Sequence, residues 1–153
     1  MAGPEIHRSQ AEHNKATAKK LLEQQPHHDW AITAAFYAAV HYFECWLFKK
    51  YGEHTETTIP INPDGKLEYT AHGWREQLIK THLSRKAFTS FRKLRSASET
   101  ARYLSLSRLS PRSSPDWIRS PASEYFSVEQ ARELVEEVLC RFVEELGIDP
   151  SSG

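Results

Sequence analysis

Apolar side chains recur at helical spacing in several segments of the chain, and no segment shows a convincing strand pattern. The first helical segment, 11–25, is rich in good helix formers and ends at Pro26. The second, 29–51, begins with Asp29, a suitable N-cap, and stops before Gly52. Apolar residues surround this second helix almost completely, so we predict that it is central and buried.

The second half of the chain predicts further helices. A helical pattern covers 71–82, and another follows the N-cap candidate Ser84 and continues to 104. The final helix is predicted from the capping-box sequence that begins at Ser127, and it runs until Gly147.

Two stretches inside the predicted bundle are irregular. The segment 53–70 contains the turn sequence Asn62-Pro63-Asp64-Gly65 and predicts a loop that has room for a short hairpin. The stretch 105–126 is rich in Ser and Pro and predicts a long connection.

These elements predict the fold class. Helices without strands bury their apolar stripes most simply in an all-α, up-down bundle, here of four to five main helices. We predict one domain that covers 11–146, with an N-terminal tail at 1–10 and a C-terminal tail at 147–153.

Composition supports a folded protein with reduced thiols. The chain has 153 residues, of which 39% are hydrophobic and 11% aromatic, and this excludes an intrinsically disordered protein. Its two cysteines, Cys45 and Cys140, are too few for a disulfide scaffold or a four-cysteine zinc site. The first residues lack the apolar core of a signal peptide, so we expect a cytoplasmic protein. The longest apolar stretch, 30–48, carries His41 and Glu44 in its interior, so we expect no membrane span.

Charge is unevenly distributed although the net charge is zero. Residues 1–65 carry six Lys and Arg against eight Asp and Glu, 66–112 carry eleven against three, and 113–153 carry three against nine. The basic middle block favours an anionic partner such as nucleic acid. Alternatively, it neutralises the acidic final helix within the fold.

One pair of residues carries candidate chemistry. The chain has no Walker A loop and no G-x-G-x-x-G, H-E-x-x-H or G-x-S-x-G motif. Arg75 and His82 share one face of the predicted helix, about 10 Å apart along its axis. An imidazole can move a proton near neutral pH, and a guanidinium binds phosphate oxygens. Alternatively, His82 caps the helix end or packs half-buried.

A metal site is not predicted. His41 and Cys45 are four positions apart, which suits two ligands on a helix, but no third ligand is evident. We therefore expect neither a metal nor a cofactor, and a core histidine beside a buried thiol accounts for the pair.

The second helix and the segment after it resemble a known family. The run AAFYAAVHYFECWL at 34–47, a polar loop, and then His72-Gly73-Trp74-Arg75 are similar to the HEPN domain. The sequences FRKL at 91–94 and SETARY at 98–103 also resemble small prokaryotic HEPN proteins. This resemblance implies an all-helical bundle that is usually a homodimer.

The resemblance also implies an activity. Active HEPN proteins are metal-independent ribonucleases with an R-x(4 to 6)-H motif, which two subunits pair to form one cleft for single-stranded RNA. By this similarity, Arg75 would hold the scissile phosphate and His82 would move the proton of the ribose 2′-hydroxyl, leaving a cyclic phosphate. The aromatic and cationic residues predicted to bind the RNA are His72, Trp74, Lys80, Arg85, Lys86, Arg92, Lys93 and Arg95. For the cationic ones, a solvated surface without a ligand is the alternative.

Two functions from different classes follow from the resemblance. The first is a ribonuclease of the toxin-antitoxin or phage-defence type. The second is a non-catalytic HEPN module that binds a nucleotide or a partner protein, such as a cognate nucleotidyltransferase or antitoxin. A buried ring of His82 favours the module, whereas a ring in a shared basic cleft favours the nuclease.

Overall fold

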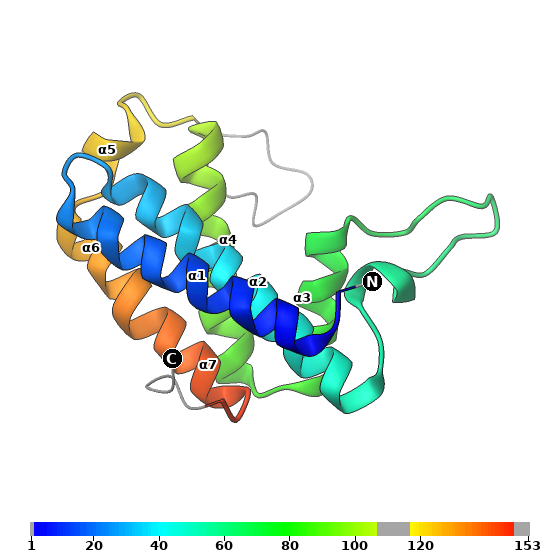
Figure 1. The fold of residues 1–153 in the computed structure, drawn as a ribbon. Helices are drawn as coiled ribbons and strands as arrows, with labels where there is room; N and C mark the ends of the chain where they lie inside the picture. The colour runs from blue at the N-terminus through cyan, green and yellow to red at the C-terminus, as the bar shows by residue number, and fades with distance from the viewer. Residues whose placement is uncertain (1, 107–116, 149–153) are drawn as a thin grey trace.

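A long antiparallel helix hairpin forms the first half of the protein. The computed structural model describes residues 2–106 and 117–148. Helix α1 (Pro4–Glu23) packs along α2 (His28–Tyr51), with the chain reversing at 24–27 (Figure 1). The predicted tail at 1–10 is wrong from Pro4 onward, because proline suits the first helical turn and the buried Ala11 and Ala18 hold this helix against α2.

Helix α2 is buried, as its sequence predicts. Ile32, Phe36 and Phe43 have no exposed surface. The helix ends at Gly52, whose positive φ of 69° is a conformation that glycine adopts without strain. Its N-cap is His27 and not the predicted Asp29.

The chain then leaves the bundle before it returns as α3. A single 3₁₀ turn, η1 (Thr55–Thr58), is followed by a loop that projects from the body and reverses at 62–65 (Figure 1). A bridge between Ile61 and Leu67 is the short hairpin for which the sequence has room.

Two further helices begin at side-chain caps. The hydroxyl of Thr70 accepts a hydrogen bond from Gly73 at the start of α3 (Ala71–His82). The predicted cap Ser84 is confirmed, since its hydroxyl accepts a hydrogen bond from Ala87 at the start of α4 (Arg85–Tyr103).

The last helix is continuous but not uniform. It consists of α6 (Val128–Arg132), a π-helical stretch η2 (Glu133–Val138) and α7 (Leu139–Glu145). The predicted capping box is confirmed, because Ser127 and Gln130 exchange backbone and side-chain hydrogen bonds. Within the predicted irregular connection, α5 (Ala122–Tyr125) is a short helix, and positions 107–116 lie outside the described residues.

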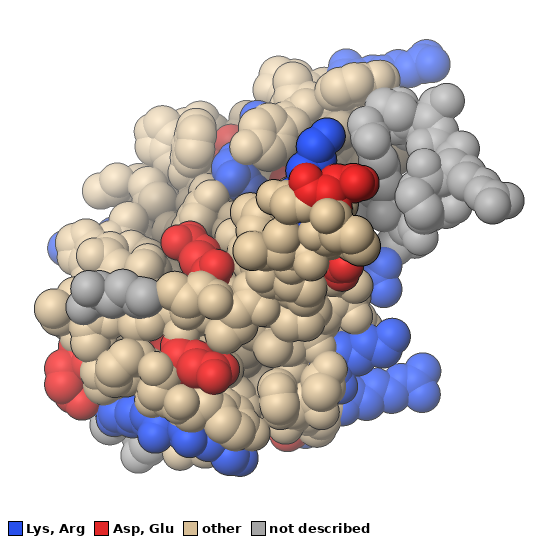
Figure 2. All heavy atoms as spheres, turned by 90° about the vertical axis from the view of Figure 1, so that its right-hand side faces the viewer, with Lys and Arg blue, Asp and Glu red and all other residues tan. Residues whose placement is uncertain are grey.

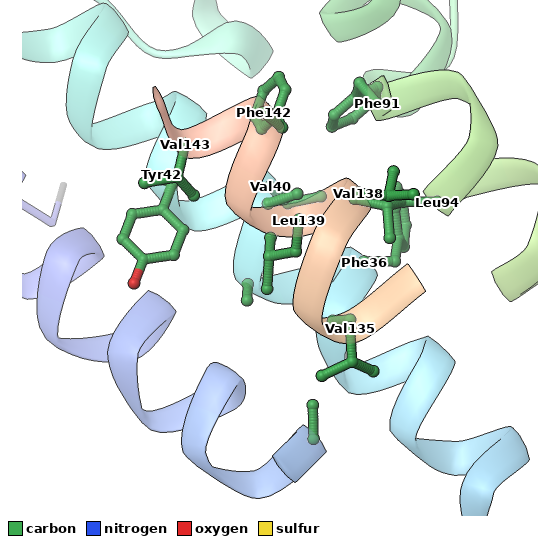
Figure 3. Packing of buried hydrophobic residues seen from close by; sticks show 14 of the residues in the cluster. Phe36, Val40, Tyr42, Phe91, Leu94, Val135, Val138, Leu139, Phe142 and Val143 are labelled. Atoms are coloured by element: carbon green, nitrogen blue, oxygen red, sulfur yellow. The ribbon is translucent and has the colours of Figure 1, made fainter. Parts of the chain in front are cut away.

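The core lies where α2, α4 and the last helix meet. Phe36 and Val40 from α2 face Phe91 and Leu94 from α4, and Phe142 from α7 joins them (Figure 3). The prediction of an all-α bundle is confirmed for the described residues. Within the same residues, no helix combines the length and the apolar character that a membrane crossing needs.

Candidate functional site

A cavity of about 590 Å³ with several polar side chains in its walls lies at the end of the bundle from which the loop projects (Figure 1). Its walls come from the start of α1, the middle of α2, η1 and the start of α3. The side chains that carry chemistry there are His7, Tyr37, His41, Glu44, His54, Glu56, His72 and Arg75.

A buried ion pair forms the base of this cavity. Nε of Arg75 lies 2.9 Å from Oε1 of Glu44, and both residues are at most 5% exposed. The backbone N–H and the hydroxyl of Thr55 also donate to the Glu44 carboxylate. Burial by itself would raise the pKa of Glu44, but Arg75 and the two Thr55 hydrogen bonds bring this pKa below its usual value. Glu44 therefore stays ionised and holds the guanidinium in place.

Arg75 determines which nitrogen of His72 carries a proton. Its Nη1 lies 2.7 Å from Nδ1 of His72, and a guanidinium can only donate. Nδ1 must therefore accept, and the neutral ring carries its proton on Nε2. Burial, followed by the charges of Arg75, Arg95 and Arg102, lowers the pKa of His72 to about 4. His72 is thus a neutral hydrogen-bond donor in a positive electrostatic field.

Three more histidines meet in the wall of the cavity. Nδ1 of His7 lies 3.0 Å from Nδ1 of His41, and Nε2 of His7 lies 3.1 Å from Nε2 of His54. Because His7 uses a different nitrogen for each neighbour, the three rings cannot bind one metal ion together. No group of metal-ligating side chains suited to an ion is found among residues 2–106 and 117–148. His41 and Cys45 diverge, since Cys45 lines a different hollow beside Trp46 and Leu146.

A tyrosine and a carboxylate complete the cavity. Nη1 of Arg102 lies 2.9 Å from the hydroxyl oxygen of Tyr37, so this oxygen accepts and its proton is available to a ligand. Glu56, which is exposed, lines the cavity and adds a negative charge.

The structure does not bring the predicted pair Arg75 and His82 together within one chain. The guanidinium of Arg75 points toward His72, three residues earlier in α3, whereas His82 follows it by seven residues. His82 is exposed at the end of α3, where its Nδ1 lies 3.3 Å from the hydroxyl of Tyr51. Arg75 and His82 of one chain therefore do not face a common site at which both could bind one phosphate.

Of the predicted RNA-binding residues, His72 lines the cavity and the others lie outside it. Trp74 donates to Thr58 and packs on Tyr69, with ring centroids 5.1 Å apart. The cationic residues occupy the surface of α3 and α4. Arg85 and Lys93 are exposed, and Lys80 lies over the ring of Phe88. Three others lie near carboxylates, since Lys86 is near Glu145, and Arg92 and Arg95 pair with Glu76.

These ion pairs reduce the positive charge of the surface. Figure 2, which faces the end with the projecting loop, shows several Asp and Glu side chains in its middle and Lys and Arg mostly toward its edges. The described surface on this side is therefore not a continuous basic cleft.

Sequence reasoning missed most of the cavity. His7 lies in the predicted N-terminal tail, and Glu44 lies within the predicted apolar helix, where the sequence assigns it no function. His41 and Glu44 carry a usable signal, because their spacing puts both on one side of α2. Nothing local indicates that His54 faces the same space.

Comparison of the chain with protein-family models, with curated proteins and with solved structures finds no match. The resemblance to the HEPN domain thus stays a prediction.

The shifted pKa of His72 predicts a pH-dependent stability. In the unfolded chain this ring has an ordinary pKa of about 6.5, so between that value and about 4 the unfolded state binds a proton that the folded state does not. The stabilisation is complete above the unfolded pKa and is lost as the pH falls. Because the ring is only partly buried, we expect it to account for about 1–2 kcal/mol of the free energy of unfolding lost between about pH 7 and about pH 5.

Urea unfolding across this pH range measures the effect. The variant His72→Gln keeps an acceptor for Arg75 but does not titrate, so its curve should fall less steeply, whereas the exposed His13→Gln should follow the wild type. Parallel curves for wild type and His72→Gln would show that His72 does not have this pKa.

Proposed function

We propose that this protein binds single-stranded RNA and that its cavity holds one phosphodiester group. The observation that carries this proposal is the set of donors around Arg75. Nε2–H of His72, the hydroxyl proton of Tyr37 and the Nη2 amino group of Arg75 are used by no hydrogen bond within the described residues. Donors without matching acceptors suit an anion with several oxygens.

The electrostatics of the site support the same ligand class. Three arginines, at positions 75, 95 and 102, act on His72 with a positive field. Glu44 offsets much of the charge of Arg75, and Arg95 is paired with Glu76 and Glu99. Arg102 has no carboxylate partner among the described residues and stacks over Tyr37 and Tyr103. Arg102 is not one of the residues that line the cavity, so it would act on a bound phosphate through its charge and through the hydroxyl of Tyr37, which it orients.

RNA binding can be tested by fluorescence anisotropy of a short labelled oligoribonucleotide in excess EDTA. We expect His72→Gln to weaken binding about tenfold, the value of one charge-assisted hydrogen bond. Arg102→Gln should weaken binding about two- to fivefold, because it removes a nearby positive charge and the contact that orients the Tyr37 hydroxyl. Glu56→Gln, which removes the carboxylate at the rim, should strengthen binding about two- to fivefold. His13→Gln on the far part of α1 is the matched control. Equal affinities for all these proteins, or no binding by the wild type, would contradict the proposal.

Metal-independent cleavage of the bound RNA is the second candidate function. His72 lines the cavity and would protonate the leaving 5′ oxygen as an imidazolium, which requires the bound phosphate to raise the pKa of this ring and to draw Nη1 of Arg75 away from Nδ1. A base for the 2′-hydroxyl is not supplied by His72 or His41, since Nδ1 of each ring is already engaged. The exposed His82 of a second subunit would supply it in a homodimer.

The products distinguish cleavage from binding without chemistry. With EDTA present, a nuclease should leave 2′,3′-cyclic phosphate ends, and His72→Gln or His82→Ala should reduce the rate by about 10²-fold or more. Binding that leaves the RNA intact would instead identify a non-catalytic module. Cleavage that both variants retain at the wild-type rate would exclude these roles.

A further inference from the structure

Three histidines from separate elements form a hydrogen-bonded chain in the wall of the cavity. His7 from α1 lies between His41 from α2 and His54, which precedes η1. The ring centroid of His7 lies 5.3 Å from that of His41 and 5.1 Å from that of His54. The proposed RNA-binding function uses none of these rings as a phosphate clamp.

A backbone carbonyl orders the protons along this chain. Nε2 of His54 lies 2.8 Å from the carbonyl oxygen of Ala2, which can only accept, so this nitrogen carries a proton. The same N–H also faces Nε2 of His7, which must therefore present its lone pair. A neutral His7 then has its proton on Nδ1 and donates it to Nδ1 of His41. This sequence of donors and acceptors leaves His41 with its proton on Nε2.

The ordered chain can accept one further proton without losing a hydrogen bond. Of its six ring nitrogens, Nδ1 of His54 is the one whose lone pair no hydrogen bond of the described residues uses. A proton that enters there leaves both contacts of His7 intact. A proton on Nε2 of His7 would instead face the N–H of His54 and break the chain.

Charged groups from several elements surround the three histidines, and a bound anion would change the electrostatic balance there. Glu44 from α2 and Arg75 from α3 act on His7 and His41 with opposite signs, while His72 from α3 and Glu56 from η1 share the cavity. Burial is the main cause that lowers the pKa of both His7 and His41, and these rings are neutral near pH 7. A phosphate in the cavity would add a negative charge that favours protonation of the chain.

We propose that the chain His54, His7 and His41 makes phosphate binding proton-coupled, so that the cavity takes up one phosphodiester together with one proton held on Nδ1 of His54. The proton comes from water or buffer, forms an imidazolium and leaves when the ligand leaves. This inference rests on the proposed RNA-binding function. By linkage, the affinity must then rise as the pH falls.

Isothermal titration calorimetry with a dinucleoside monophosphate tests the coupling. This probe has one phosphodiester and does not titrate near neutral pH, so any proton taken up from buffers of different ionisation enthalpy is bound by the protein. We expect the wild type to take up about 0.3–1 proton when it binds the probe near pH 6.5. Its affinity should fall about two- to fivefold when the pH is raised by about one unit from there.

The matched variant is His54→Gln, whose amide can still donate to Ala2 and His7 but cannot take the proton. We expect it to bind with almost no proton uptake and with pH-independent affinity, whereas His13→Gln should behave as the wild type. Binding without proton uptake by the wild type would overturn this inference alone. Absence of binding at every pH would overturn the proposed function and this inference with it.

The proton order has a signature that needs no ligand. Long-range ¹H–¹⁵N correlation spectra should show His7 protonated on Nδ1 and His41 and His54 protonated on Nε2 at about pH 7.5. A ring of His7 protonated on Nε2, or charged at this pH, would refute the ordered chain. His54→Gln should retain the Nδ1–H form of His7.

Discussion

Replacing Glu44 by alanine is expected to lower the free energy of unfolding by about 3–5 kcal/mol, because it leaves the guanidinium of Arg75 buried without its counter-charge. The backbone N–H and hydroxyl of Thr55 lose their acceptor at the same time. Urea unfolding followed by circular dichroism measures the loss. We expect the cavity to lose its shape as well, since Glu44 holds Arg75 beside His72.

Two further variants separate the charge from the packing. Glu44→Gln keeps an acceptor for Thr55 but removes the negative charge. Its loss in free energy of unfolding should be smaller than that of Glu44→Ala, and it measures the contribution of the ion pair. The double variant Glu44→Leu/Arg75→Leu removes both charges and should be more stable than Glu44→Ala, because no unpaired charge is left buried. A loss below about 1 kcal/mol for Glu44→Ala would mean that Arg75 finds another partner or reaches water.

Phe91→Ala is expected to have a comparable effect through the core, with a loss of about 3–5 kcal/mol. Phe91 has no exposed surface, and its ring lies 5.7 Å from that of Phe36 on α2 and 5.4 Å from that of Phe142 on α7. Its removal leaves a cavity between three helices (Figure 3). Thermal and urea unfolding of the variant measure the effect.

Phe88, three residues earlier on α4 and only partly buried, is the matched control. Phe88→Ala should cost clearly less, since part of the ring is already in contact with water. Equal losses for the two variants would show that α4 is rotated relative to the arrangement described.

The local sequence was sufficient for most helices and their ends. The capping box at Ser127, the cap at Ser84 and the glycine after α2 act within a few residues, so their effect can be predicted without knowledge of the rest of the chain. The all-round apolar character of α2 likewise predicts burial on every side.

Local rules failed where packing decides. The start of α1 carries few apolar residues, and the sequence predicts a tail there, but contact with α2 holds it in a helix from Pro4. The final helix contains a π-helical stretch at Glu133–Val138 that no periodicity of the sequence indicates. For α1, the contacts with α2 outweigh the weak local preference.

The candidate site belongs to this second class. The spacing of Arg75 and His82 puts both residues on α3, but only the folded chain shows that Glu44 draws the guanidinium inward and that His72 becomes its neighbour. The contacts of His7 with His41 and His54 span 34 and 47 residues of sequence. Helical periodicity and capping depend on neighbours along the chain, whereas a polar cavity depends on which side chains three helices and a loop bring to the same place. For this protein, residue order accounts for the helices, and their packing accounts for the chemistry that they enclose.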